Sequence, residues 1–279
     1  MSERTIDPAA LFGAYMRITG VPTLADETAR LGTADGALPE SNALRGKTLG
    51  IINGASWTSL WSTYFGRLIL PGVKLVNVGN EAVQLNFMAA HERGDPVPPQ
   101  INIDLFASYA KDLAELCEID ALIITCSTMN RSADSVRNAV RDRAIPVVQI
   151  DEAMMEAALD HGGRPLVVAT HGPTVKNTQA LLRETAERAG REVDYAGATV
   201  EEAFELLGRG DINGHNEVIA GAIREAGRRE RIDSVILAQL SMSVFTFSFP
   251  DPEAEFGVPV FTSGEAGFRK VRAILEGEA

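Results

Sequence analysis

The chain has 279 residues, of which 45% are hydrophobic and 23% are charged, a composition typical of a globular protein with one large core or two modest ones. Its formal net charge of −12, with no stripe of lysine and arginine to offset it, argues against nucleic acid as a partner. The apolar runs are only as long as strands, and the first residues lack the pattern of a signal peptide, so we expect no membrane span and a cytoplasmic protein.

Short apolar, β-branched runs alternate with stretches of helical periodicity along the chain. Strands are predicted at 49–53, 73–78, 121–126, 146–150, 166–170, 192–195, 234–239 and 258–262. Helices are predicted between them, at 58–69, 102–117, 132–143, 151–160, 174–190, 200–209, 214–229 and 265–276. This alternation is typical of parallel α/β sheets. Residues 1–45, which precede it, are predicted to form a helical arm.

The two halves of the chain repeat each other. The segment DALIITCSTMN (120–130) aligns without gaps with DSVILAQLSMS (233–243), and GKTLGIINGAS matches GRPLVVATHGP, at offsets of about 113–117 residues. The repeat predicts an α/β fold of two pseudo-symmetric lobes, one formed by 46–147 plus 258–279 and the other by 148–257. Because ligands bind beyond the carboxyl ends of parallel strands, the active site is expected in a cleft between the lobes.

Cys126 ends a predicted strand and is followed by Ser127, Thr128 and Asn130 and then by a helix. Hydroxyl and backbone N–H donors near a helix start lower the pKa of a thiol and also suit a substrate carboxylate. Cys126 is therefore predicted to be catalytic, and the alternative is a small apolar residue of the core. We interpret Cys117, in an amphipathic helix, in that second way.

Three other loops are expected at the same edge of the sheets. The loop after Asn53 resembles both a carboxylate-binding loop and an ordinary helix start. In the second half, His171 could exchange a proton near neutral pH, or it could be a half-exposed loop histidine. Gln239, opposite Cys126 in the repeat, can bind a substrate but cannot shuttle protons. The predicted substrate-binding residues are Asn53, Ser56, Thr58, Ser127, Thr128, Asn130, Thr170, Thr174, Gln239 and Ser241.

The remaining histidines and the motif search add little chemistry. His91, His161 and His215 are interpreted as surface residues of helices or loops. The sequence has no glycine-rich nucleotide-binding loop, no zinc-type spacing of Cys and His and no nucleophilic serine elbow. We therefore expect no cofactor and no metal.

The segment ITCSTMNRSADSVRNAV resembles the first motif of the aspartate/glutamate racemase superfamily, in which Cys-Asn-Thr precedes a helix. Here the motif reads Cys126-Ser127-Thr128. LGIINGASWTS resembles the opening segment of that superfamily, and LVVATHGPTV resembles its mid-chain counterpart. The resemblance covers residues 46–276 and implies a cofactor-independent enzyme with a small carboxylate substrate. It also suggests a homodimer.

The second half departs from the family pattern. Racemases of this group use two cysteines on opposite faces of the α-carbon, and the second lies in a Gly-Cys-Thr motif that here reads Ala238-Gln239-Leu240. Arylmalonate decarboxylases keep one thiol, in the second half, and maleate isomerases suggest a first-half thiolate that adds to a double bond. A single-thiol decarboxylase or isomerase with an enediolate-like intermediate is therefore expected. The alternatives are a racemase or epimerase that uses Cys126 with His171, nucleophilic hydrolysis or transfer at Cys126, and a relative that binds carboxylates without catalysis.

Overall fold

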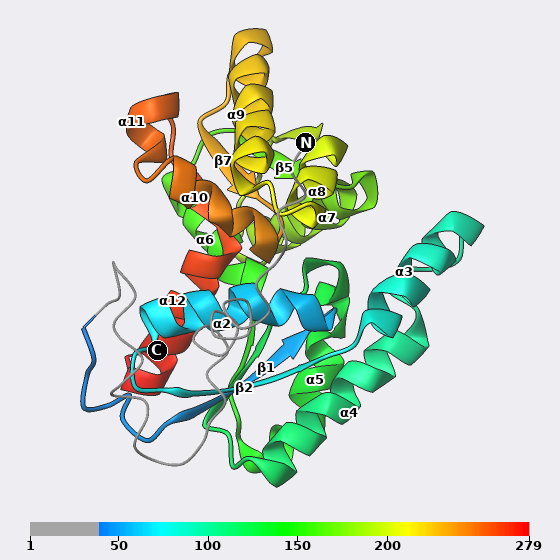
Figure 1. The fold of residues 1–279 in the computed structure, drawn as a ribbon, viewed down its shortest axis with the longest axis vertical. Helices are drawn as coiled ribbons and strands as arrows, with labels where there is room; N and C mark the ends of the chain where they lie inside the picture. Colours follow the sequence, from blue (N-terminus) through cyan, green and yellow to red (C-terminus); the bar gives the residue numbers. More distant parts are fainter. Residues whose placement is uncertain (1–38, 279) are drawn as a thin grey trace, which may run out of the picture.

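Two parallel sheets of four strands form the framework of the protein, which a computed structural model describes over residues 39–278 (Figure 1). The first sheet has the order β2-β1-β3-β4 and the second the order β6-β5-β7-β8. The strands of the first sheet are β1 (Thr48–Asn53), β2 (Lys74–Gly79), β3 (Ala121–Ile124) and β4 (Val147–Gln149). Those of the second are β5 (Pro165–Ala169), β6 (Ala196–Thr199), β7 (Ser234–Leu237) and β8 (Val260–Thr262). The identical order confirms the predicted fold class and the sequence repeat.

Helices cover both faces of each sheet (Figure 1). The helices of the first half are α2 (Ser59–Ile69), α3 (Glu81–Arg93), α4 (Gln100–Leu116) and α5 (Ala133–Ala139). The second half contributes α6 (Ile150–His161), α7 (Gly172–Arg188), α8 (Glu201–Gly208), α9 (Ile212–Arg229), α10 (Phe245–Ser248), α11 (Pro252–Phe256) and α12 (Ser263–Glu276). No helix within 39–278 combines the length and the apolar content needed to cross a bilayer.

The strand β3 shows why the sequence folds this way. All four of its residues are buried, as expected for a strand with helices on both faces. Ile123 points into a cluster with residues of α2 and α12, whereas Leu122 and Ile124 point into a cluster with residues of α4 and α5. Successive side chains of a strand alternate between its faces, so one apolar run fills two cores.

The boundary predicted at residue 258 is wrong for the strand that follows it. β8 pairs with β7 in the second sheet, with Val260 opposite Val235, and does not join the first sheet. The helix after it does return to the first lobe, where Phe268 and Val271 of α12 are buried beside α2 (Figure 1). α12 also packs closely on α6, because Gly267 lies where any Cβ would overlap Ile150. The predicted arm lies outside the described residues except for 39–45, which hold a turn.

Two elements differ from their sequence predictions. The strand predicted at 192–195 lies directly after that range, as β6. Val193 and Tyr195 precede the strand pairing and pack against the core. Helix α3 was not predicted. The side chain of Asn80 caps it, accepting a hydrogen bond of 2.9 Å from the backbone N–H of Ala82, and Val83 and Phe87 bury its apolar face.

Candidate active site

The sulfur of Cys126 lies at the carboxyl ends of β1 and β3. Cys126 lies two residues after the end of β3 and occupies the N-cap position of a short 3₁₀ helix, η2 (Ser127–Ser132). Its side chain is half-buried. Gly54, which directly follows β1, packs so closely against it that a Cβ on Gly54 would overlap the sulfur. The two neighbouring strands therefore bring the thiol and the backbone of the Gly54 loop into contact.

The protonation of Cys126 differs from the sequence prediction. The Oγ1 atom of Thr128 lies 3.1 Å from the sulfur, and the backbone N–H groups of Thr128 and Met129 also favour the thiolate. Burial outweighs these contacts and raises the pKa of the Cys126 thiol, and the nearby carboxylate of Asp151 raises it further. The prediction of a lowered thiol pKa is therefore wrong. The sequence shows the hydrogen-bond donors near Cys126 but not how much water the surrounding protein removes from the sulfur. At neutral pH the thiol keeps its proton.

Asp151 belongs to this site, and sequence reasoning missed it. It is the second residue of helix α6, which follows β4 directly, and is only 1% exposed. Its carboxylate accepts hydrogen bonds from the Ser127 hydroxyl at 3.1 Å and from the Gln149 amide at 3.2 Å. Burial raises the pKa of Asp151 to about 7. The one available signal was an acidic residue immediately after an apolar strand in IPVVQIDEA.

In the second half, the side chain of Gln239 is held by its own sheet. Its Oε1 atom accepts hydrogen bonds of 2.8 Å from both the backbone N–H and the hydroxyl of Thr170. His171 is the N-cap residue of α7 and packs edge-on against Phe204, with ring centroids 4.7 Å apart. Burial lowers the pKa of His171, so its imidazole is neutral at pH 7. Thr170 and Gln239, both predicted binding residues, are thus brought together by the second sheet.

The polar side chains at the end of β1 and in the loop after it form hydrogen bonds with other groups of the protein. Asn53 is buried, donating to Asn77 at 3.0 Å and accepting from Thr125 at 2.7 Å. The Ser56 hydroxyl and backbone N–H both donate to Glu81 at an exposed position. Thr58 donates to the carbonyl oxygen of Ala55 at 2.7 Å. These three side chains are engaged in hydrogen bonds with other parts of the protein, and it is Gly54 of this loop that packs against the sulfur.

The other predicted binding residues lie in the turns that follow the strands. The Ser127 hydroxyl donates a hydrogen bond to Asp151, whereas the Thr128 hydroxyl contacts the sulfur. Three more are at least nine-tenths buried, namely Asn130 in η2, Thr174 in α7 and Ser241 in η4 (Leu240–Val244). All three follow the ends of β3, β5 and β7 and are shielded from bulk water.

His215 is not the surface residue that the sequence suggested. It is fully buried near the start of α9, where Nδ1 lies 2.8 Å from Oδ1 of Asn216 and Nε2 has no partner among the described residues. Asn216 in turn donates to the carbonyl oxygen of Val244 in η4. Burial lowers the pKa of His215, because a charged imidazole would lack water and a counter-charge.

We expect the wild type to lose stability relative to a His215→Asn variant as the pH falls from 7 to 5. Below about pH 6.5 the unfolded chain protonates His215 while the folded chain does not, so protons favour unfolding until the lowered folded-state pKa is reached. The slope is at most about 1.4 kcal/mol per pH unit. Urea unfolding at several pH values measures it. The exposed His91, replaced by asparagine, serves as the control. An equal change in the pH dependence of stability for that variant would refute the attribution of the effect to the burial of His215.

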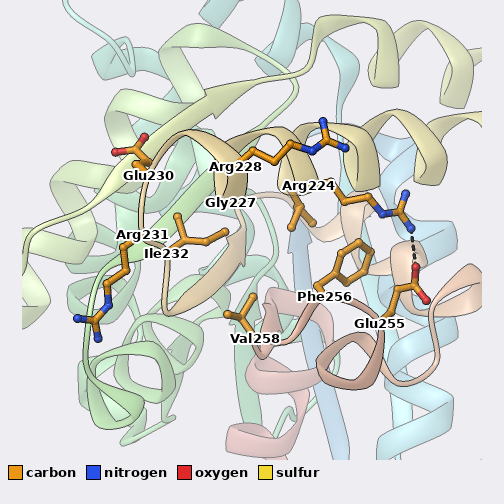
Figure 2. Close-up of a pocket in the computed structure, with 10 residues that line it drawn as sticks. Arg224, Gly227, Arg228, Glu230, Arg231, Ile232, Glu255, Phe256 and Val258 are labelled. Carbon is orange, nitrogen blue, oxygen red and sulfur yellow. Dashed lines mark hydrogen bonds and ion pairs between the residues drawn. The ribbon is translucent and has the colours of Figure 1, made fainter.

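Two cavities in the second lobe lie away from these residues. One of about 420 Å³ is lined by the end of α9 and by α11, and Figure 2 shows Arg224 directed at Glu255 beside the ring of Phe256. Arg228 and Arg231 at its rim are also ion-paired, with Glu225 and Asp233. The second, of about 440 Å³, adjoins Gly162 and Gly163. Neither contains a predicted site residue. Within the described range no three acidic, His or Cys side chains are grouped to hold a metal ion.

Sequence and structure comparisons relate the chain to known proteins. A sequence model of the family described as Asp/Glu/Hydantoin racemase matches residues 96–271, more than half of the chain. This segment includes Cys126, Asp151, His171 and Gln239. A search of curated protein sequences found no match.

Solved racemase structures share the fold. Glutamate racemase from Francisella tularensis, in complex with D-glutamate, is 19% identical with a TM-score of 0.58, covering 82% of this chain and 81% of that one. An aspartate racemase homologue from Pyrococcus horikoshii is 21% identical with a TM-score of 0.59, covering 82% and 99%. Allantoin racemase from Pseudomonas fluorescens is 18% identical with a TM-score of 0.53, covering 82% and 90%.

Proposed function

The chain belongs to the Asp/Glu/Hydantoin racemase family, and from that premise we propose that it is a cofactor-independent enzyme acting at the α-carbon of a small carboxylic acid. Cys126 would be its one reactive thiol, and the intermediate would be enediolate-like. The family model supports an isomerase-type activity, and the choice among reactions rests on the residues of the two halves.

The contrast between Cys126 and Gln239 carries this proposal. The two residues hold equivalent positions, each directly before a short 3₁₀ helix at the end of the third strand of its sheet. One is a thiol that can give or take a proton, and the other is an amide that cannot. Since Gln239 is also held by two hydrogen bonds from Thr170, it is suited to shape and bind rather than to react.

Proton donation is the role that suits Cys126 best. Its raised pKa keeps the S–H bond intact at neutral pH. The thiol would donate its proton to the α-carbon of an enediolate, forming a C–H bond and leaving a thiolate that solvent later reprotonates. Thr128, Asn130, Thr174 and backbone N–H groups at the ends of the strands would stabilise the negative oxygen, each by about 3–4 kcal/mol if well aimed.

A single thiol serves one face of the α-carbon, which favours decarboxylation or isomerisation over racemisation. The second candidate is a racemase or epimerase in which His171 serves the other face. One observation supports it: His171, the N-cap residue of α7 just beyond β5, is a neutral, half-buried imidazole, the form that accepts protons. The remaining alternative is a relative that binds carboxylates without turnover.

The test is a panel of small malonates, maleate, amino acids and hydantoins incubated in deuterated water. Carbon dioxide release with deuterium on one face indicates a decarboxylase, and double-bond isomerisation without α-deuteration indicates covalent use of the thiol. Inversion of the α-carbon with deuterium in the product indicates the racemase. Binding of carboxylates without exchange or product across the panel would contradict an enzymatic function.

A further inference from the structure

The carboxyl group of Asp151, which contacts the residue next to Cys126, is buried without a counter-ion. Asp151 is 1% exposed, and no Lys, Arg or His nitrogen of residues 39–278 lies within ion-pair distance of it. Its hydrogen bonds come only from neutral donors, the hydroxyl of Ser127 and the amide of Gln149. Ionisation of a carboxyl group in this setting costs free energy, because burial removes its water and no cation nearby compensates the negative charge.

The charges on the surrounding elements are already paired elsewhere. Glu152, next to Asp151 on α6, forms ion pairs with Arg137 of α5 at 2.9 Å and Arg188 of α7 at 3.4 Å. Arg131 of η2 pairs with Glu184 at 2.7 Å. On α12, Glu265 pairs with Arg269. The charge of Asp151 therefore acts on the Cys126 thiol, whose pKa it raises, while Glu152 repels Asp151 from the next position on α6.

The internal repeat links this carboxyl group to the thiol. Asp151 follows Cys126 at the same spacing at which Gly264 follows Gln239. At Gly264 a Cβ would come within 2.8 Å of Ser243 Oγ, and its backbone N–H donates to that hydroxyl at 3.0 Å. The half without a thiol therefore has neither a carboxyl group nor space for one, whereas the half with the thiol has both.

We propose that Asp151 is a positioning residue that controls, by electrostatic coupling, whether Cys126 carries its proton. This inference deepens the proposed function and rests on it for its catalytic meaning. Ser127, the chain neighbour of Cys126, donates to the Asp151 carboxylate at 3.1 Å, so the two acids are neighbours and a negative charge on Asp151 disfavours one on the sulfur. While Asp151 is ionised the sulfur stays protonated and acts as an acid. Once Asp151 is protonated, the thiolate left after proton donation no longer faces the repulsion of a second negative charge.

The test measures the thiol directly and needs no substrate. In a Cys117→Ala background, the rate of iodoacetamide alkylation at Cys126 is followed by peptide mass spectrometry from pH 5 to 9. Asp151→Asn is expected to match its parent below about pH 6, where the carboxyl group is already neutral. Above about pH 7.5 it should react about tenfold faster, which corresponds to a fall of about one unit in the thiol pKa.

The matched control is Glu156→Gln, which removes an exposed carboxylate of the same helix that acts on neither Asp151 nor Cys126. It should leave the alkylation profile unchanged. If Asp151→Asn fails to fold, Ser127→Ala replaces it: loss of the Ser127 hydrogen bond raises the pKa of Asp151, so the pH at which alkylation is suppressed should move upward. Profiles that superimpose on the parent for the folded variants would overturn the proposal. A protein that shows the coupling but no activity on any carboxylate would instead refute only the proposed function.

Discussion

Replacing Cys126 by alanine is expected to abolish turnover, with a loss of about 10²–10⁴-fold, the usual contribution of one positioned acid or base. The second half offers no thiol to take over, because Gln239 stands at the equivalent position. The variant should fold normally, since the side chain is half-buried and its one side-chain hydrogen-bond partner is Thr128. Initial rates on the best substrate of the carboxylate panel measure the effect.

Cys117→Ala is the matched control. Cys117 caps the end of α4, is half-buried, and packs against the cluster formed by α3, α4 and α5. Its replacement should leave the rate unchanged within a factor of about two and reduce stability only slightly. A Cys126→Ala enzyme that keeps more than a tenth of the wild-type rate would contradict an essential role for the sulfur.

Replacing Gly54 by alanine is expected to have an effect of similar size although the side chain added is only a methyl group. Its Cβ would overlap the sulfur of Cys126, so the sulfur or the loop must move. A displacement of about 1 Å at a reacting group costs about 10²-fold in rate. We therefore expect turnover to fall by about that factor and the alkylation rate of Cys126 to change, while the circular dichroism spectrum stays that of the wild type.

Gly221→Ala in α9 provides the control for the Gly54 variant. A Cβ at Gly221 meets no atom within 4 Å, and alanine suits a helix better than glycine. This variant should keep full activity and gain up to about 1 kcal/mol of stability. Full activity in Gly54→Ala would show that the loop after β1 does not define the position of the thiol.

The repeat made most of the fold predictable from the sequence. Hydrophobic runs placed seven of the eight strands within a few residues, and the alignment of 120–130 with 233–243 predicted two sheets of the same design. The path of the chain between the lobes was predicted correctly for helix α12 but not for strand β8. β8 stays with the second sheet while α12 crosses to the first, an arrangement that depends on the close contact of Gly267 with Ile150.

The site was predictable only where a residue type signals its own chemistry. Cys126 and Gln239 could be found because they end equivalent strands, and Thr170 does contact Gln239. Asp151 and His215 were missed or misread because burial, which shifts their pKa values, comes from packing between segments distant in the sequence. The same packing reverses the pKa shift expected for Cys126, and Glu81 takes up the Ser56 donors that the sequence had assigned to a substrate.

Alkylation of the native protein by bromoacetate and by bromoacetamide tests most directly whether Cys126 is a thiol at a carboxylate-binding site. The two reagents differ in the presence of a carboxylate, so the comparison reports recognition of that group. We predict that bromoacetate modifies Cys126, with a rate that saturates as its concentration rises and that acetate lowers, whereas bromoacetamide shows no saturation. Modification of Cys117 alone, or a bromoacetate rate at Cys126 that neither saturates nor responds to acetate, would contradict the account.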